Sequence, residues 1–114
     1  MKSRHSRVAG AIAIFAMAFP VAALAAEEAT YRIEFNDGAM TPTRLEVPAN
    51  TRIVLELVNK GKTPAEFESR ELIKEKVLAP GSSSTLVIRT LDPGEYDFFD
   101  DFHPEAAPAK LIAK

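Results

Sequence analysis

The sequence predicts an all-β domain, a Greek-key β-sandwich of about seven short strands. Apolar and polar residues alternate with a period of two along several short segments, which is typical of strands with one buried face. Turn-forming residues separate these segments at intervals of roughly eight to twelve residues. No long segment has the periodicity of an amphipathic helix.

The clearest predicted strand is 51–59, where Ile53, Leu55 and Leu57 share one face. Residues 70–74 could hold a helical turn, and we expect a loop at 100–108 before the last strand. The turn sequences are Asn36-Asp37-Gly38, Ala79-Pro80-Gly81 and Asp92-Pro93-Gly94. The expected strands are 31–35, 44–47, 51–59, 65–69, 75–78, 82–89, 95–99 and 109–113.

The N-terminal segment has the features of an export signal. Lys2, Arg4 and Arg7 precede an uncharged run from 8 to 24, and Ala23-Leu24-Ala25 is a small-x-small cleavage sequence. We therefore expect a signal peptide at 1–25, a mature domain at 26–114 and a periplasmic location. The alternative is an uncleaved membrane anchor, because the uncharged run is nearly long enough to span a bilayer.

Composition limits the function classes. The net charge is −2, and cleavage before Ala26 would remove three of the 14 basic residues and none of the 16 acidic ones, leaving −5. Such a domain is not expected to bind nucleic acid or anionic lipid. The chain has no cysteine, and His103 is the one histidine beyond the expected signal. No nucleophile-elbow or phosphate-binding glycine motif is present.

The segment Asp100-Asp101-Phe102-His103-Pro104-Glu105 places carboxylates and an imidazole within a few residues of one another. These side chains could converge on a metal ion, or the acids could cap backbone amides of a polar loop. Both readings remain open.

Two further features could contribute metal ligands. Glu66 and Glu68 flank Phe67, so strand alternation places both carboxylates on one face, which could equally be a solvated sheet face. Met40 follows the Asp37-Gly38 turn in an expected loop. Its thioether would suit Cu⁺, or its side chain could fill one end of the core.

Three segments resemble the cupredoxin pattern: 59–67, 79–82 and 92–98. In that family a His₂Cys set with a weak methionine holds copper. The resemblance places Ala65 at the first histidine, Asp100 at the cysteine and His103 at the second histidine, with Pro108 near the axial methionine. Because the thiolate is missing, the resemblance does not imply a blue copper centre or electron transfer of that kind.

The phrases Pro64–Ser69 and Phe98–Pro104 are similar to those of small periplasmic cupredoxin-like proteins that accompany bacterial iron permeases, of which the EfeO-type domain is the nearest named relative. This resemblance implies a copper or iron ion bound by Met40, Glu66, Asp101 and His103. Glu68 and Asp100 are reserve ligands. The implied partners are a membrane iron permease and another redox protein.

The sequence favours a periplasmic metal-binding accessory protein of an iron-uptake system over an enzyme. One alternative is a small copper-dependent ferroxidase that oxidises ferrous iron before transport. Oxidation needs a route for electrons, and one set of ligands without a second metal provides none. The other alternative is a cupredoxin shell without metal that binds a partner protein.

Overall fold

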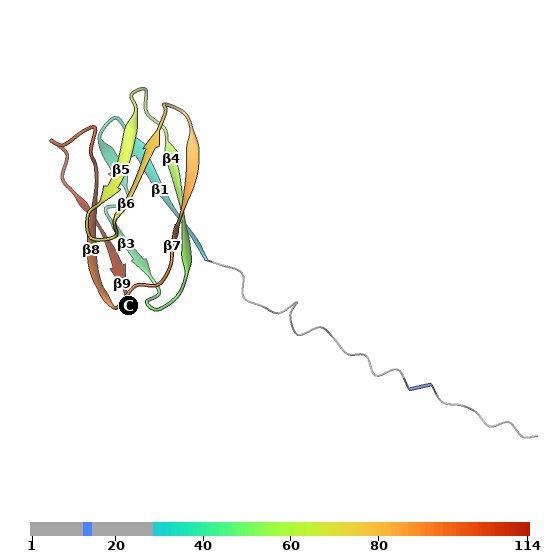
Figure 1. Ribbon diagram of the computed structural model, residues 1–114. Coiled ribbons are helices and arrows are strands. Elements are labelled where there is room, and N and C mark those ends of the chain that lie inside the picture. Colours follow the sequence, from blue (N-terminus) through green and yellow to red (C-terminus); the bar gives the residue numbers. More distant parts are fainter. Residues whose placement is uncertain (1–12, 15–28) are drawn as a thin grey trace, which may run out of the picture.

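The computed structural model describes residues 13–14 and 29–114 of the chain. Apart from residues 13–14, the expected signal peptide and its cleavage site lie outside the described residues. None of the described segments is a helix long and apolar enough to cross a membrane. The described domain consists of strands joined by turns and loops (Figure 1).

Nine strands form two sheets that pack face to face (Figure 1). A four-stranded sheet has the order β2-β1-β4-β7, and a five-stranded sheet has the order β3-β9-β8-β5-β6. This confirms the predicted all-β sandwich, with nine strands in place of about seven. The strands are β1 Thr30–Asn36, β2 Ala39–Thr41, β3 Arg44–Val47, β4 Ile53–Asn59, β5 Ala65–Ser69, β6 Lys74–Leu78, β7 Ser83–Ile88, β8 Gly94–Asp100 and β9 Ala109–Ala113.

The sheets are mixed because the chain crosses between the two layers. β1 runs parallel to β4, and β3 runs parallel to β9, whereas the other pairs are antiparallel. Neighbouring strands in each sheet are mostly distant in sequence, so long-range pairing holds the sandwich together.

Alternation along the strands places one side-chain row of each sheet in the core. β4 buries Ile53, Leu55 and Leu57 as predicted. From the other sheet, Phe67 and Phe98 are fully buried and stack with ring centroids 5.2 Å apart. Burying each of these side chains contributes on the order of 2 kcal/mol, so the core supplies most of the stability in a chain without disulfides.

The sequence-based prediction of a loop around Met40 is wrong. Met40 lies in β2, opposite Phe35 of β1, and packs in the core with 7% of its surface exposed. Asp37 and Gly38 have φ angles of 49° and 100°, as required in the tightest hairpin turns. The turn was recognised, but the three-residue strand after it is too short to show a period.

The segment 70–74, where the sequence allows a helical turn, contains a turn that ends one residue earlier, at Ile73. Residues 70–73 form the turn of the β5–β6 hairpin, and β6 already begins at Lys74. Ser69 pairs with Lys74 and Glu68 with Glu75. The turn therefore keeps the outward faces of β5 and β6 in register, and this sets the position of the acidic side chains described next.

Candidate metal centre

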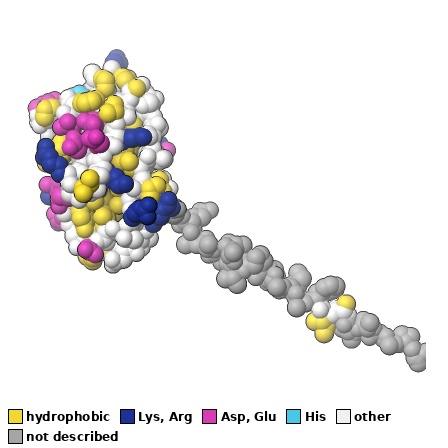
Figure 2. Space-filling view, viewed as in Figure 1, with side chains coloured by type: hydrophobic (Ala, Val, Ile, Leu, Met, Phe, Trp, Pro, Cys, Tyr) yellow, Lys and Arg dark blue, Asp and Glu magenta, His cyan; other side chains and the backbone are white. Residues whose placement is uncertain are grey.

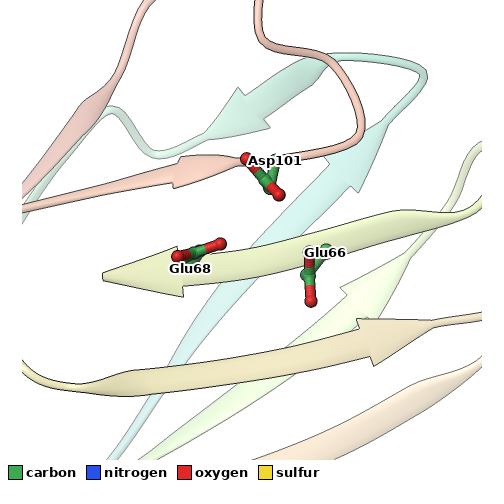
Figure 3. Close-up of side chains that lie close together, drawn as sticks. All are labelled: Glu66, Glu68 and Asp101. Atoms are coloured by element: carbon green, nitrogen blue, oxygen red, sulfur yellow. The ribbon is translucent and has the colours of Figure 1, made fainter. Parts of the chain in front are cut away.

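Three carboxylates converge on the outer face of the five-stranded sheet. Glu66, Glu68 and Asp101 each offer an oxygen atom, and these atoms all lie within 4.8 Å of one another. Figure 3 shows Glu66 and Glu68 side by side along β5, with Asp101 approaching from the chain that leaves β8. We call these three residues the carboxylate cluster.

The backbone explains why the three side chains meet. In β5 the buried residues alternate with Glu66 and Glu68, so both glutamates lie on the same outward face, as predicted. β8 runs antiparallel to β5 and pairs with it up to Asp100. The amide of Asp101 then donates a hydrogen bond of 2.9 Å to the carbonyl of Glu66. This contact holds Asp101 beside the glutamates.

The electrostatics of the cluster are unfavourable without a cation. The pKa of Glu66 is raised, first by partial burial, then by the charges of Glu75, Asp101 and Glu68, and last by a hydrogen bond with the Asp101 side chain. Glu75 faces Glu68 across the β5–β6 pair, so a fourth acid adjoins the cluster. Like charges at this spacing repel each other, and a bound cation would relieve that repulsion.

The described residues provide no Lys or Arg ion pair to the cluster. Within residues 29–114, none of its three carboxylates forms an ion pair with Lys or Arg. Arg70 lies near, but its guanidinium covers the ring of Phe99 at 4.9 Å. Figure 2 shows acidic side chains gathered on the face in view, with apolar side chains and also Lys and Arg side chains around them.

Asp100, the neighbour of Asp101, has the opposite environment. It is 1% exposed, and its Oδ1 accepts hydrogen bonds from the amides of Glu66 at 2.9 Å and Phe102 at 3.1 Å. Its Oδ2 lies 2.8 Å from Nδ1 of His103. The carboxylate of Asp100 thus fixes the loop after β8 to β5, which is a structural task.

His103 is held at both ring nitrogens. Nδ1 faces Asp100, and Nε2 lies 3.2 Å from the hydroxyl of Thr63, which is itself 2.7 Å from Oδ1 of Asp37. The pKa of Asp37 is lowered, chiefly by the hydrogen bonds from Thr63 and Lys62 and further by the charge of His103. The chain Asp100–His103–Thr63–Asp37 therefore connects the last loop to the β1–β2 turn.

Gly61 makes room for this connection. A Cβ atom on Gly61 would lie 2.6 Å from the backbone nitrogen of Asp37, closer than side chains approach. Glycine is needed here because the β1–β2 turn rests directly on the backbone of the loop that also supplies Thr63.

The structure brings together only part of the predicted ligand set. Glu66 and Asp101 meet, and the reserve ligand Glu68 joins them. His103 is not among these converging ligands, Met40 packs in the core, and the reserve ligand Asp100 bonds backbone amides.

Sequence reasoning missed three residues of this region: Glu75, which adjoins the carboxylate cluster, and Thr63 and Asp37, which are connected to His103. The short β5–β6 hairpin carries a signal for Glu75, because pairing across it places Glu75 opposite Glu68. Asp37 and Thr63 lie 26 positions apart, and no local pattern indicates that they meet.

Comparison with known proteins assigns the family. Residues 8–113 match the family model of the cupredoxin-like domain. The chain belongs to the cupredoxin-like domain family. An uncharacterized protein of Rickettsia prowazekii (strain Madrid E) is 37% identical over 81 residues, covering 71% of this chain. The match spans 65% of that relative's own length, just under two thirds.

Solved cupredoxins share the fold at low sequence identity. A purple cupredoxin from Nitrosopumilus maritimus has a TM-score of 0.57 at 17% identity, covering 74% of this chain and 99% of that one. Auracyanin from the photosynthetic bacterium Roseiflexus castenholzii has a TM-score of 0.62 at 16% identity, covering 78% and 99%. Auracyanin B has a TM-score of 0.63 at 18% identity, covering 75% and 88%. These similarities concern the fold alone.

The donor atoms of this cupredoxin-like chain do not fit the blue copper centre for which the fold is known. That centre requires a cysteine thiolate, and the chain contains no cysteine. The ligands that converge among residues 29–114 are carboxylate oxygens only. Oxygen donors of this kind suit hard cations.

Proposed function

We propose that this cupredoxin-like chain is a periplasmic accessory protein that binds iron at the carboxylate cluster and serves a membrane iron permease. The observation that carries the proposal is the convergence of Glu66, Glu68 and Asp101 without a Lys or Arg partner among the described residues. The export signal predicted from the sequence supports the periplasmic location, and the similarity to iron-permease-associated proteins supports the partner.

The donor chemistry supports iron over Cu⁺. Three carboxylates offer hard oxygen ligands and a high negative charge, which favours Fe³⁺ and Fe²⁺ over the soft Cu⁺ ion. The partial burial of Glu66 and Glu68 lowers the local dielectric and strengthens attraction to a cation, while the exposure of Asp101 leaves the ion accessible for exchange. An accessory protein that passes metal on needs such access.

The ferroxidase alternative has no specific support. The described residues contain one group of converging ligands, whereas oxidation without another redox protein needs a second metal or another electron acceptor. In the metal-free shell, a cation of a partner protein and not a metal ion would have to relieve the repulsion within the cluster.

Isothermal titration of the purified protein with Fe²⁺ under anaerobic conditions tests the proposal. We expect one equivalent to bind, and Glu66→Gln to weaken binding at least about tenfold, since one charged ligand is lost. Glu95→Gln, an exposed acid at the start of β8, is the matched control and should bind like the wild type. Absence of binding by the wild-type protein would refute the proposal.

A further inference from the structure

Exposed apolar side chains gather around the carboxylate cluster. In the domain formed by residues 29–114, the large apolar residues with high exposure are Ile73 at 87%, Val77 at 55% and Phe102 at 47%. Val77 lies opposite Glu66 across the β5–β6 pair, and Phe102 directly follows Asp101. Ile73 ends the turn of the same hairpin. Their concentration at one place indicates a surface that is covered by another molecule.

Ile73 lowers the stability of the folded protein in two ways. Besides its exposure, its φ angle is 55°, in the left-handed region that β-branched residues rarely adopt. Glycine or asparagine would adopt this conformation with less strain. A strained and exposed isoleucine is understandable if its side chain contacts a partner, because residues held in such conformations concentrate at functional sites.

Two hollows adjoin the cluster. One of about 520 Å³ shares Asp101 and has Phe99, Pro104 and Pro108 among its lining residues. The other, of about 410 Å³, shares Glu68 and includes Ile73. The acids of the cluster therefore lie beside concave surfaces whose walls combine apolar side chains with charged ones, among them Arg70 and Lys74. Such a shape can receive protruding side chains of another protein.

We propose that this face, comprising the carboxylate cluster with Ile73, Val77 and Phe102, is a docking surface for a partner protein that presents Lys or Arg among apolar side chains. A consequence for metal binding rests on the proposed function. Docking and metal binding exclude each other, because both use the same carboxylates. A basic side chain of the partner would pair with Glu66 or Asp101 and displace the cation.

Charge selects this occupant over two others. A second copy packed on the same face would bring four more acids, Glu66, Glu68, Glu75 and Asp101, and only Arg70 and Lys74 as cations of the adjoining hollows, so the negative charge would stay unbalanced. An anionic lipid surface would be repelled in the same way. A basic and apolar protein surface satisfies the uncompensated charges and buries the exposed side chains.

The mutual exclusion of docking and metal binding has a consequence through thermodynamic linkage. If the partner's cation weakens metal binding, bound metal must weaken docking by the same factor. The partner would then bind the metal-free protein more tightly and lower the metal affinity of the protein that it meets. This is the coupling required for transfer of metal at the moment of contact.

Photo-crosslinking tests the docking surface. A photoreactive amino acid replaces Val77 in the full chain, produced in cells that make the protein natively, with Thr85 on the exposed side of β7 as the control position. We expect a protein adduct from position 77 and none from position 85. The crosslinked partner segment should contain Lys or Arg beside apolar residues. A covalent dimer of this chain, lipid adducts alone, or no adduct would overturn the proposal.

Two variants separate this inference from the proposed function. The double variant Glu66→Gln/Glu68→Gln should lower adduct yield at least about tenfold, as should saturation of the wild type with Fe²⁺. Ile73→Asn should lower adduct yield, raise the melting temperature and leave Fe²⁺ affinity unchanged. If adducts form in this pattern but the protein binds no iron, docking stands and the proposed function fails. If iron binds but adduct yield ignores both glutamates, docking fails alone.

Discussion

Asp100 and Asp101 are neighbours in the sequence, and the structure uses their carboxylates in opposite ways. Asp100 is 1% exposed and meets three hydrogen-bonding groups, from Glu66, Phe102 and His103. Asp101 points outward into a group of acids, and no Lys or Arg in the described part of the chain pairs with it. The carboxylate of Asp100 has its hydrogen-bonding partners within the protein, whereas the carboxylate of Asp101 is accessible to a bound cation or a partner protein.

The difference shows how to separate structural from functional acids. A buried carboxylate that accepts from backbone amides stabilises a loop, and removing it harms the fold. A cluster of carboxylates that repel one another destabilises the folded protein, so removing one member should raise stability while weakening metal binding. Mutations in the two regions should therefore change stability in opposite directions.

The largest effect is expected for Asp100→Ala. The change leaves two backbone amides and Nδ1 of His103 without an acceptor in a buried place, so we expect the free energy of unfolding to fall by roughly 3 kcal/mol or more. Urea denaturation followed by circular dichroism measures this. Asp101→Asn is the control and should change stability by no more than about 0.5 kcal/mol. Equal effects of the two changes would abolish the distinction.

A smaller effect with the opposite sign is expected for Ile73→Asn. Asparagine tolerates a φ of 55° better than isoleucine does, so the free energy of unfolding should rise by about 1 kcal/mol. The same urea series measures the gain. Val77→Ser changes another exposed apolar residue, 55% exposed against 87% for Ile73, in an ordinary strand conformation and should give no gain. A gain there would point to exposure and not strain as the cause.

Glu66→Gln should raise stability at pH 7 by about 0.5 kcal/mol, because like charges on neighbouring strands are destabilising. The pH dependence supports the same conclusion. The folded-state pKa of Glu66 is raised, so the folded state binds more protons than the unfolded state between the ordinary and the raised pKa. Stability from this group falls as pH rises through that window, and Glu66→Gln should remove this slope in unfolding measured from pH 4 to 7.

Asp37 should titrate with the reverse sign. Its folded-state pKa is lowered, so its contribution to stability is present above the ordinary pKa and is lost as pH falls through the lowered value. Thr63→Val removes the hydroxyl that bonds this carboxylate and should shift the pKa of Asp37 back toward its ordinary value. Carbon chemical shifts of the Asp37 carboxyl group, followed by NMR through an acid titration, measure the shift. An unchanged pKa would show that Thr63 does not hold Asp37.

Much of the fold, and part of the carboxylate cluster, could be predicted from the sequence because local patterns indicate them. Period-two alternation located β4 and the shared face of Glu66 and Glu68, and family resemblance indicated Asp101. The prediction of a loop at Met40 failed because a three-residue strand has no period. At 70–74 the sequence left the kind of turn open, because helical and hairpin turns share local composition.

The site itself depended on information that local patterns lack. The sequence predicts Asp100, Asp101 and His103 as one group of ligands because they are close along the chain. Which of them faces the core and which faces solvent is set by the pairing of β8 with β5 and by contacts to Thr63 and Asp37, more than 25 residues away from each other. Such choices follow from tertiary packing.

The most direct test of the central claim compares the iron affinities of Asp101→Asn and His103→Gln by anaerobic Fe²⁺ titration. If the carboxylate cluster binds the metal, Asp101→Asn should weaken binding at least about tenfold, whereas His103→Gln should stay within about twofold of the wild type. If His103→Gln loses as much affinity as Asp101→Asn, the metal instead lies at a mixed site that includes the histidine, and the separation between the two regions is wrong.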